Sequence, residues 1–548
     1  MHDIILIGNN KINKHIKYKC KYIKNDIYWG LGIENELYLE FEKKKIMNIK
    51  DFLKKHKNER YSINYFSNYK KEYLNEAFNS IIKDLVICDK ITLPILLNSH
   101  SFSKTDKNNN SKTLYTTSNN NPIFNPIFDS ETLLETLEKY NDYFKSEINY
   151  KWLFDGDTIE FVTNDFYKVT TSTVFTELFA NKIEFIEKIN ESMQNLNIFS
   201  EYGKVKFMEH NHPFGTYMTN LNNVAIFNNG TLHYNLTLPT ELDNNALIKD
   251  VNKFINDHKK AIKLIQWCEP LIIAVYGSKD PFSEISNKFS HCSQRCAVSR
   301  YISIGTYDTD KMIPGKILTS PIDEISCNKL NYWWFHKYYE DNAYTKLNTI
   351  GCDINFNKHY NHGIELRFID YIEDEHKLKE SFEFIIYLMD LILESDDINN
   401  FDNPIMNKLW NNIVLQIMKS GTKYELTDNE KELYEKIFNL KIISSNIEDI
   451  YYEIYYNLVL KYNNVSRTNE NDFLLIPRGI FSSLAIDSKK INFKDLLKNT
   501  CGLLDEKINN LNKSIEPIKS IEPIKPFDIE NINININDSK FKKCCIIM

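Results

Sequence analysis

The sequence predicts an α+β fold, in which short strands form a mostly antiparallel sheet and helices pack over it. Four segments alternate apolar and polar residues with a period of two, the pattern of strands that bury one face. Farther along the chain, residues 377–394 carry an apolar stripe at helical spacing, and residues near 400–460 resemble further helices. The charges within 377–394 exclude a membrane span there, because a span needs about 20 predominantly apolar residues.

The first alternating segment is Trp29–Phe41. On one face of such a strand lie Glu34, Glu36, Tyr38 and Glu40, and on the other lie Ile33, Asn35, Leu37, Leu39 and Phe41. One face suits a hydrophobic core and the other suits cations. An ordinary surface strand shows the same alternation, so the repetition of this pattern in other segments decides the interpretation.

Three later segments repeat the pattern with polar groups that bind cations or phosphate. Residues 230–239 place His233, Asn235 and Thr237 on one face, against Leu232, Tyr234, Leu236 and Leu238. Residues 363–370 place Glu365 and Arg367 together, and residues 157–163 place Glu160 opposite Ile159 and Phe161. We therefore expect the polar groups of all four strands to point the same way.

Several carboxylates in one partly buried cleft are costly unless cations compensate them. Oxygen ligands with one imidazole suit Mg²⁺ or Mn²⁺ better than Zn²⁺. Arg295 and Arg300 add guanidinium groups suited to phosphate or carboxylate, although each is equally compatible with a surface salt bridge. The pattern predicts a metal site that handles phosphate.

These residues also carry a family resemblance. The motifs are Gly-Ile-Glu-Asn-Glu (32–36), Ile-Glu-Phe-Val-Thr (159–163), Gly-Thr-Leu-His-Tyr-Asn-Leu-Thr-Leu-Pro (230–239) and Gly-Ile-Glu-Leu-Arg (363–367). Similar motifs occur in the same order in glutamate–cysteine ligases, so the chain resembles this family and, more widely, the glutamine synthetase-like carboxylate–amine ligases. An Arg-x4-Arg pair, Arg295 and Arg300, resembles one in glutamine synthetases.

The resemblance implies a fold and a reaction. The fold would be a curved, mostly antiparallel sheet that forms a funnel covered by helices, with ATP entering one end and an acid substrate the other. The reaction would transfer the γ-phosphoryl group of ATP to a carboxylate, and an amine would then displace phosphate to form an amide. Glutamate and cysteine would give γ-glutamylcysteine, a step of glutathione biosynthesis.

The resemblance also implies residue roles around ATP and two or more Mg²⁺ or Mn²⁺ ions. Glu34, His233 and Glu365 would hold the ion nearer the transferred phosphoryl, and Glu36 and Glu160 would hold another. Arg367 and Arg295 would stabilise charge on the phosphoryl group during catalysis. Nucleotide or substrate binding would involve Arg300, Arg295, Arg367 and Asn235.

The chain departs from compact bacterial ligases in the long interval between Glu36 and Glu160. Residues about 45–150 are therefore interpreted as an insertion with helices and a loop at Lys104–Asn121. Glu209 is either a further ligand or an ordinary strand residue. The acceptor amine is not identified, so an amidoligase with another acceptor and a catalytically silent membrane scaffold remain alternatives.

Length and composition suit one large domain with insertions as well as two or three domains, and the resemblance implies one catalytic domain over residues 1–505, mainly helical from about 372 to 500. The chain has 548 residues with 42% hydrophobic content, which is enough for an extensive core. Its net charge of −7 and lack of a dominant basic tract argue against nucleic acid as a partner. Ten cysteines without paired spacing favour a reducing compartment. We expect a cytoplasmic enzyme with small-molecule substrates, and no residue pattern indicates an oligomeric state.

Residues 506–548 are predicted to be a flexible, low-complexity tail. A direct repeat, Lys-Ser-Ile-Glu-Pro-Ile, begins at Lys513 and again at Lys519. The last four residues, from Cys545 to Met548, match a prenylation box of the farnesyl type. Cys544 is a candidate palmitoylation site, and nearby lysines would attract anionic lipid. Two lipid signals suffice for stable anchoring, so the tail predicts tethering to the cytoplasmic leaflet of a membrane.

Overall fold

The structure is a computed structural model, and the statements below concern the residues that it describes. These are 27–54, 86–93, 95–97, 133–145, 151–155, 158–164, 171–195, 200, 202–208, 231–241, 243, 248–278, 293, 307–310, 313–314, 354–356, 363–395 and 397–463. All of them lie within Met1–Lys494, the first of the two units into which the chain divides.

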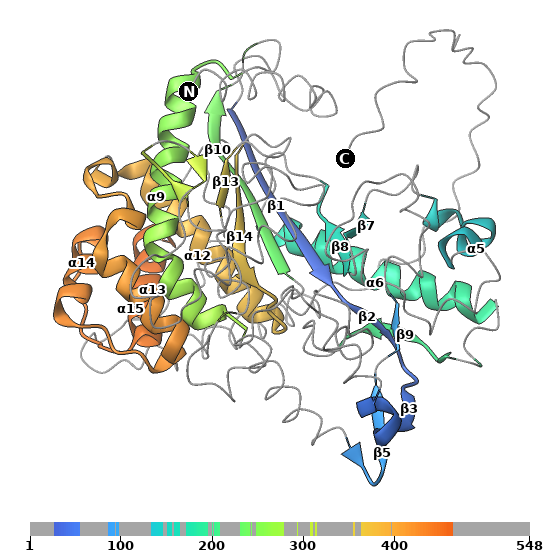
Figure 1. The fold of residues 1–548 in the computed structure, drawn as a ribbon. Coiled ribbons are helices and arrows are strands. Elements are labelled where there is room, and N and C mark those ends of the chain that lie inside the picture. Colours follow the sequence, from blue (N-terminus) through green and yellow to red (C-terminus); the bar gives the residue numbers. More distant parts are fainter. Residues whose placement is uncertain are drawn as a thin grey trace, which may run out of the picture. The chain divides into compact units, whose positions relative to one another are not determined.

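The centre of the fold is a six-stranded sheet. Its strands are β1 Ile27–Leu37, β7 Trp152–Asp155, β8 Thr158–Val162, β10 Thr231–Glu241, β13 Ile354–Phe356 and β14 Ile364–Asp370. Their order is β13-β14-β10-β1-β8-β7, and every neighbouring pair is antiparallel (Figure 1). The four strands expected from alternation are β1, β8, β10 and β14. They are neighbours in the sheet, where they lie in the order β14-β10-β1-β8.

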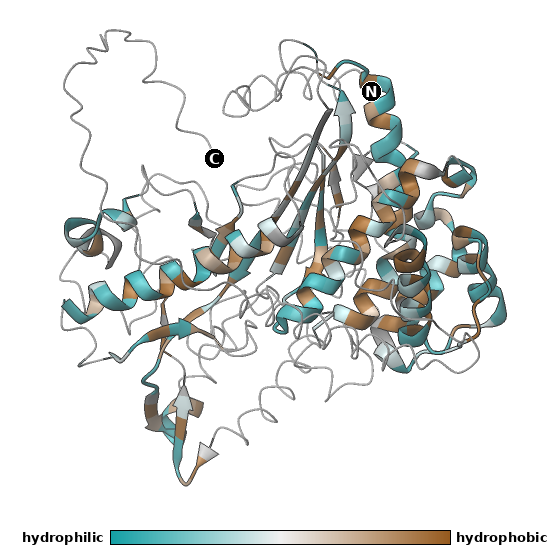
Figure 2. Ribbon diagram, turned by 180° about the vertical axis from the view of Figure 1, so that it is seen from behind, coloured by the Kyte–Doolittle hydropathy of each residue, from teal (hydrophilic) through white to brown (hydrophobic). Residues whose placement is uncertain are grey.

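Three helices pack against the apolar face of the sheet. Figure 2 shows the molecule from behind the view of Figure 1, on the side of these helices. They are α6 Thr171–Asn195, α9 Val251–Tyr276 and α12 Glu375–Glu394. Tyr234 of β10 meets Phe382 of α12 with ring centroids 4.9 Å apart, and its hydroxyl group lies 2.7 Å from that of Ser381. Asn181 of α6 donates its side-chain N–H to the carbonyl of Val162, which ties this helix to β8.

The helix expected over residues 377–394 is α12, and it begins at Glu375. Asp374 caps its N-terminus by accepting hydrogen bonds from the backbone N–H groups of His376 and Lys377. Among the described helices, none combines the length and apolar character needed to cross a membrane.

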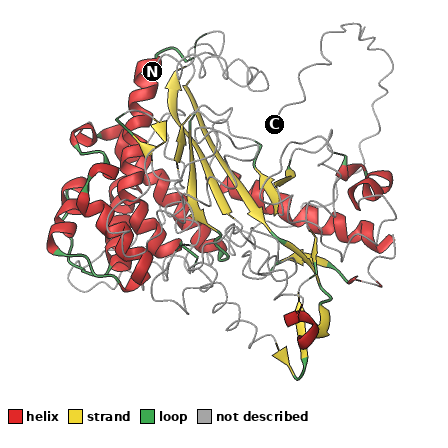
Figure 3. Cartoon of the chain, in the orientation of Figure 1, coloured by secondary structure: helices red, strands yellow, loops and turns green. Residues whose placement is uncertain are grey.

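A second group of helices packs on α9. They are α13 Lys408–Ser420, α14 Asp428–Phe438 and α15 Ile447–Asn463, together with short 3₁₀ helices at Asp397–Asn400, Pro404–Met406 and Gly421–Lys423. Trp410 of α13 donates its indole N–H to the carbonyl of Gln266 at 2.8 Å, and the hydroxyl groups of Tyr451 and Tyr276 lie 2.7 Å apart. Helix and antiparallel sheet together make the fold α+β, as predicted (Figure 3).

The predicted single strand from Trp29 to Phe41 is in fact two strands. The chain leaves the central sheet after Leu37, and Leu39–Phe41 forms β2. β2 lies between β6 Leu96–Leu97 and β9 Val205–Phe207 in a separate sheet. Glu40 therefore does not share a face with Glu34 in the central sheet, and it forms ion pairs with Lys44 and Lys206 instead.

The region interpreted as an insertion contains strands as well as helices in its described part. A small sheet has the order β3-β5-β4, built from β3 Lys45–Asn48, β4 Val86–Ile87 and β5 Lys90–Leu93. Helix α5 Leu133–Tyr140 and a 3₁₀ turn at Asp142–Phe144 follow. The expected loop Lys104–Asn121 lies outside the described residues. The remaining strands are β11 Tyr307–Asp308 and β12 Ile313–Pro314.

Candidate metal centre

The register of β1 places its two glutamates beside residues of both neighbouring strands. Glu34 pairs with His233 of β10, and Glu36 pairs with Glu160 of β8. Residues paired directly across antiparallel strands point to the same face, and residues two apart on one strand do the same. The four side chains therefore gather on one face of the sheet, opposite the face that the helices cover.

Glu365 reaches the same place from β14. It pairs with Asn235, which lies two residues after His233 on β10. The β10–β14 ladder shifts register here, so that Arg367 and Phe368 both lie opposite His233. Such bulges change the direction of side chains and are common beside functional sites. The Arg367 guanidinium lies 2.6 Å from a carboxylate oxygen of Glu365.

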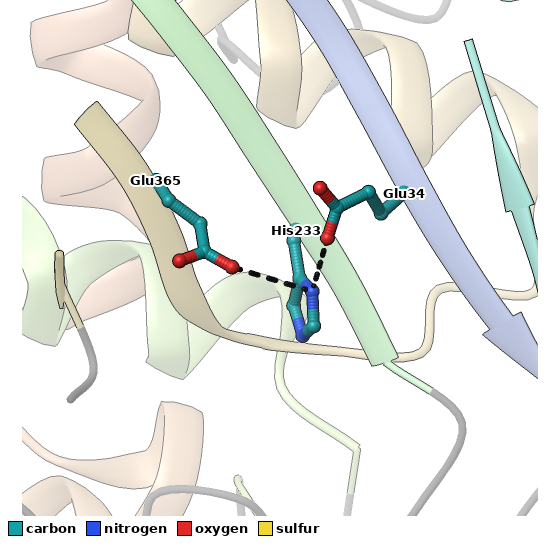
Figure 4. A group of neighbouring side chains, drawn as sticks. All are labelled: Glu34, His233 and Glu365. Carbon is teal, nitrogen blue, oxygen red and sulfur yellow. Dashed lines mark hydrogen bonds and ion pairs between the residues drawn. The ribbon is translucent and has the colours of Figure 1, made fainter. Parts of the chain in front are cut away.

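These side chains form two groups of ligand atoms, and His233 belongs to both. The groups are Glu34, His233 and Glu365, and Glu36, Glu160 and His233, with ligand atoms within 4.8 Å of one another. Nδ1 of His233 lies 2.9 Å from Glu34 Oε2 and 3.8 Å from Glu365 Oε1, so the imidazole lies between two carboxylates (Figure 4). Its Nε2 lies 3.7 Å from Glu36 Oε1. The structure thus brings together all five residues expected to bind metal.

The centre is buried and strongly negative. His233 is 1% exposed and Glu365 is 2% exposed, and the Glu34 side chain is more exposed than those of His233, Glu36 and Glu365. Burial acts to lower the pKa of the Arg367 guanidinium, but the carboxylates of Glu365, Glu36 and Glu34 outweigh burial and raise this pKa above its usual value. Arg367 therefore stays positively charged inside the cluster.

Two polar residues of β10 orient the glutamates of β1. Asn235 donates its side-chain N–H to Glu34 Oε1 at 3.0 Å. Thr231 donates its hydroxyl hydrogen to Glu36 Oε2 at 2.9 Å, and its oxygen lies 3.2 Å from His233 Nε2. Asn235 was expected at the site, but Thr231 was not. Its position two residues before His233, on the same strand face, is the signal that identifies it.

The donor atoms fit a small, hard cation. Mg²⁺ takes six ligands at about 2.1 Å in an octahedron, which puts neighbouring donors about 3 Å apart and opposite donors about 4.2 Å apart. The two distances from His233 Nδ1, 2.9 and 3.8 Å, fall near this range. Asn235 Oδ1 is buried and has no hydrogen-bond partner among the described residues, so it offers one more hard oxygen. Neither group contains cysteine, so the donors suit Mg²⁺ or Mn²⁺ better than softer metals.

Several predicted residues lie outside the described part of the chain. They are Arg295, Arg300, Glu209, Cys544 and Cys545. Their predicted roles stay predictions. Within the described part, Arg367 and Asn235 both lie at the centre, each in contact with a different glutamate.

Comparison with known proteins places the chain in a family. It is similar to an uncharacterized protein, R704, of Acanthamoeba polyphaga mimivirus, with 39% identity over 408 residues. The matched region covers 74% of this chain and 69% of the mimivirus protein. The chain belongs to the R704 family. No family model matches the sequence. In this R704-family protein, the candidate metal centre is built by four adjacent strands of one antiparallel sheet.

Proposed function

We propose that this R704-family protein is an ATP- and Mg²⁺-dependent carboxylate–amine ligase, most specifically a glutamate–cysteine ligase that makes γ-glutamylcysteine through a γ-glutamyl phosphate. The observation that carries the proposal is the convergence of Glu34, Glu36, Glu160, His233 and Glu365 on one face of an antiparallel sheet. The order of the motifs that contain them, which resembles the glutamate–cysteine ligases, supports the same reaction. The proposal includes a sheet that curves into a funnel for ATP and the acid substrate.

The resemblance assigns the roles of the residues, and the arrangement of the ligand atoms in two groups supports this assignment. Glu34, His233 and Glu365 would hold the ion nearer the transferred phosphoryl group, and Glu36 and Glu160 would hold the second ion. Bound Mg²⁺ neutralises phosphate charge and orients the reacting oxygens. The protein contributes rigid placement, because hydrogen-bonded strands rather than isolated loops carry all five ligands.

Arg367 supplies a fixed positive charge at the same place. It contacts Glu365 and keeps its proton, so it is suited to stabilise negative charge that develops on a phosphoryl group. Arg295 and Arg300 are assigned to phosphate and substrate binding by the resemblance alone. Phosphoryl transfer requires little covalent chemistry from a protein, so positioning and charge are sufficient for this mechanism.

The test uses purified full-length protein with ATP, Mg²⁺, glutamate and cysteine. We expect phosphate release that requires both amino acids, and γ-glutamylcysteine identified by mass spectrometry. Glu36→Gln should abolish both signals. Release that occurs with a different amine would keep the ligase and replace the acceptor.

A null result in this assay would also be informative. Absence of ATP-dependent amide formation across a panel of acids and amines would contradict the ligase. If Glu36→Gln and Glu365→Gln leave every measurable activity of the protein unchanged, the alternative of a catalytically silent scaffold is the correct one.

A further inference from the structure

Thr231 is the first residue of β10 and lies at the junction of the two ligand groups. Its side chain is fully buried. The hydroxyl oxygen lies 2.9 Å from Glu36 Oε2 on one side and 3.2 Å from His233 Nε2 on the other. Thr231 therefore connects a ligand of one group to the ligand that both groups share.

The hydrogens in this chain of contacts can be assigned. An ionised carboxylate only accepts hydrogen bonds, and a threonine hydroxyl has one hydrogen to donate. The hydroxyl hydrogen of Thr231 therefore points to Glu36. Its oxygen must then accept from His233, so Nε2 of His233 carries a hydrogen.

This assignment decides to which of the two ligand groups His233 contributes its metal-binding nitrogen. A neutral imidazole with its hydrogen on Nε2 has its lone pair on Nδ1. Nδ1 faces Glu34 and Glu365, at 2.9 and 3.8 Å (Figure 4). A cation bound to this lone pair would lie among the two carboxylates and would replace the hydrogen bond between Nδ1 and Glu34 Oε2 at 2.9 Å. Nδ1 is thus the ligand atom of the Glu34–Glu365 group, whereas Nε2 carries a hydrogen and lies beside the Glu36 group, 3.7 Å from Glu36 Oε1 and 3.2 Å from the Thr231 hydroxyl oxygen.

We propose that Thr231 is a positioning residue that holds His233 in the tautomer needed for metal binding and couples the two ion sites. This inference rests on the metal dependence in the proposed function. Metal-binding histidines generally donate their second ring N–H to a partner, which fixes the ring and its tautomer. Here the partner is a hydroxyl group that also orients a ligand of the second ion. Occupation of one site therefore affects the geometry of the other.

The test compares three variants of the full-length protein by Mn²⁺ binding without nucleotide, followed by electron paramagnetic resonance. Thr231→Val removes the hydroxyl group at nearly constant volume, and we expect Mn²⁺ affinity to fall at least about tenfold. Thr231→Ser keeps the hydroxyl group and should restore most of the affinity. Thr240→Val is the matched control, because Thr240 lies on the same strand and its buried hydroxyl group donates only to the carbonyl of Leu238. Its Mn²⁺ affinity should equal that of the unmodified protein.

A spectroscopic measurement tests the tautomer without any change at Thr231. In protein labelled with ¹⁵N-histidine, the His233 signals, assigned by their loss in His233→Gln, should show hydrogen on Nε2 and metal-dependent change at Nδ1 when Mg²⁺ is added. This measurement decides the question if Thr231→Val does not fold.

Four results would overturn the inference. They are unchanged Mn²⁺ affinity in Thr231→Val, a Thr231→Ser variant as weak as Thr231→Val, an Nε2 atom that carries no hydrogen, and an unmodified protein that takes up no Mn²⁺. The last result would also contradict the proposal that this cluster binds metal. In contrast, Mn²⁺ binding with the expected variant pattern but no amide formation would contradict the proposed ligase and leave the role of Thr231 intact.

Discussion

At the level of single residues, three glutamates at the centre each have a specific hydrogen-bond donor beside them. Asn235 donates to Glu34, Thr231 donates to Glu36, and Arg367 donates to Glu365. Each donor fixes the direction of one carboxylate before any cation arrives. Such preorganisation lowers the cost of assembling a metal site, because fewer side chains must be ordered on binding.

The first prediction concerns the charge of these carboxylates. Glu36→Gln and Glu365→Gln keep the side-chain shape and remove one negative charge and one ligand each. We expect each variant to weaken Mn²⁺ binding by more than about tenfold, measured by calorimetric titration of the purified protein. Expressed as free energy, the loss of Mn²⁺ binding should exceed any loss of folding stability, which thermal unfolding measures.

Glu40→Gln is the matched control for this prediction. Glu40 is also a buried glutamate, close in sequence to Glu36, but it lies in β2 and pairs with Lys44 and Lys206. The substitution should change stability without affecting Mn²⁺ affinity. Equal Mn²⁺ affinity in all three variants would show that the cluster does not bind metal.

At the level of elements, β10 is the strand on which the centre depends. It pairs with β1 on one side and with β14 on the other, and it carries His233, Asn235 and Thr231. Helices α9 and α12 contact its apolar side chains and its backbone. A change that shifts β10 or its neighbours should therefore affect the metal centre as well as stability.

Gly363, immediately before β14, tests how closely this strand must approach β10. A Cβ atom at this position would lie 1.8 Å from the carbonyl oxygen of Leu236, which is too close for any side chain. We expect Gly363→Ala to lower the free energy of unfolding by about 1–3 kcal/mol or more, measured in urea. It should also weaken Mn²⁺ binding, because Glu365 follows two residues later. A variant with unchanged stability and affinity would show that β14 does not require this close contact.

His258 of α9 links the helix layer to β10 and predicts a pH dependence of stability. Its Nδ1–H donates to the carbonyl of Phe254 at 2.8 Å, and its Nε2 accepts the backbone N–H of Leu238 at 3.1 Å. Burial lowers the pKa of His258 to about 4, against the opposing effects of the Phe254 carbonyl and Asp257. The ring is therefore neutral in the folded protein, with its hydrogen on Nδ1.

The sign of the pH effect follows from this lowered pKa. An unfolded histidine takes up a proton near pH 6.5, whereas His258 in the folded protein does so only near pH 4. The stabilisation is complete above about pH 6.5 and is lost as the pH falls towards 4. Between pH 7.5 and 5.0 we expect a loss of about 2 kcal/mol from this residue. Urea unfolding at the two pH values should show a smaller loss in His258→Gln, and an equal loss would contradict the assignment.

At the level of the whole molecule, the central sheet has two faces with different tasks. The apolar face packs against α6, α9 and α12, and the opposite face carries the metal centre. This division follows from the period of two along each strand, because every core residue is followed by one that points away from the core. The hydrophobic layer fixes the strands, and the fixed strands hold the ligands.

The predicted membrane tether also belongs to this scale. In a eukaryotic host we expect the full-length protein to sediment with membranes, and its Cys545 peptide to carry a farnesyl group detected by mass spectrometry. Cys545→Ser should move the protein to the soluble fraction. The same protein from a host without prenyltransferases is the control. An unmodified Cys545 peptide from the eukaryotic host would refute the tether.

Much of the centre is predictable from local patterns. Alternation along β1, β8, β10 and β14 assigns Glu34, Glu160, His233 and Glu365 to polar faces, because the direction of a side chain on a strand depends only on position along that strand. The helix at 377–394 follows equally from local periodicity. Alternation does not show where a strand leaves its sheet, so the end of β1 at Leu37 and the separate position of Glu40 were not predictable from it.

The sequence alone determined which residues share a polar strand face, and hence the candidate set of ligands. Only the tertiary structure decided how these strands lie beside one another. The pairing of Glu34 with His233 and the contact of Thr231 with Glu36 depend on register between segments about 200 residues apart. Register results from packing of the apolar side chains, and a bulge at Arg367 and Phe368 sets how β14 pairs with β10; both are properties of the assembled sheet rather than of any one strand.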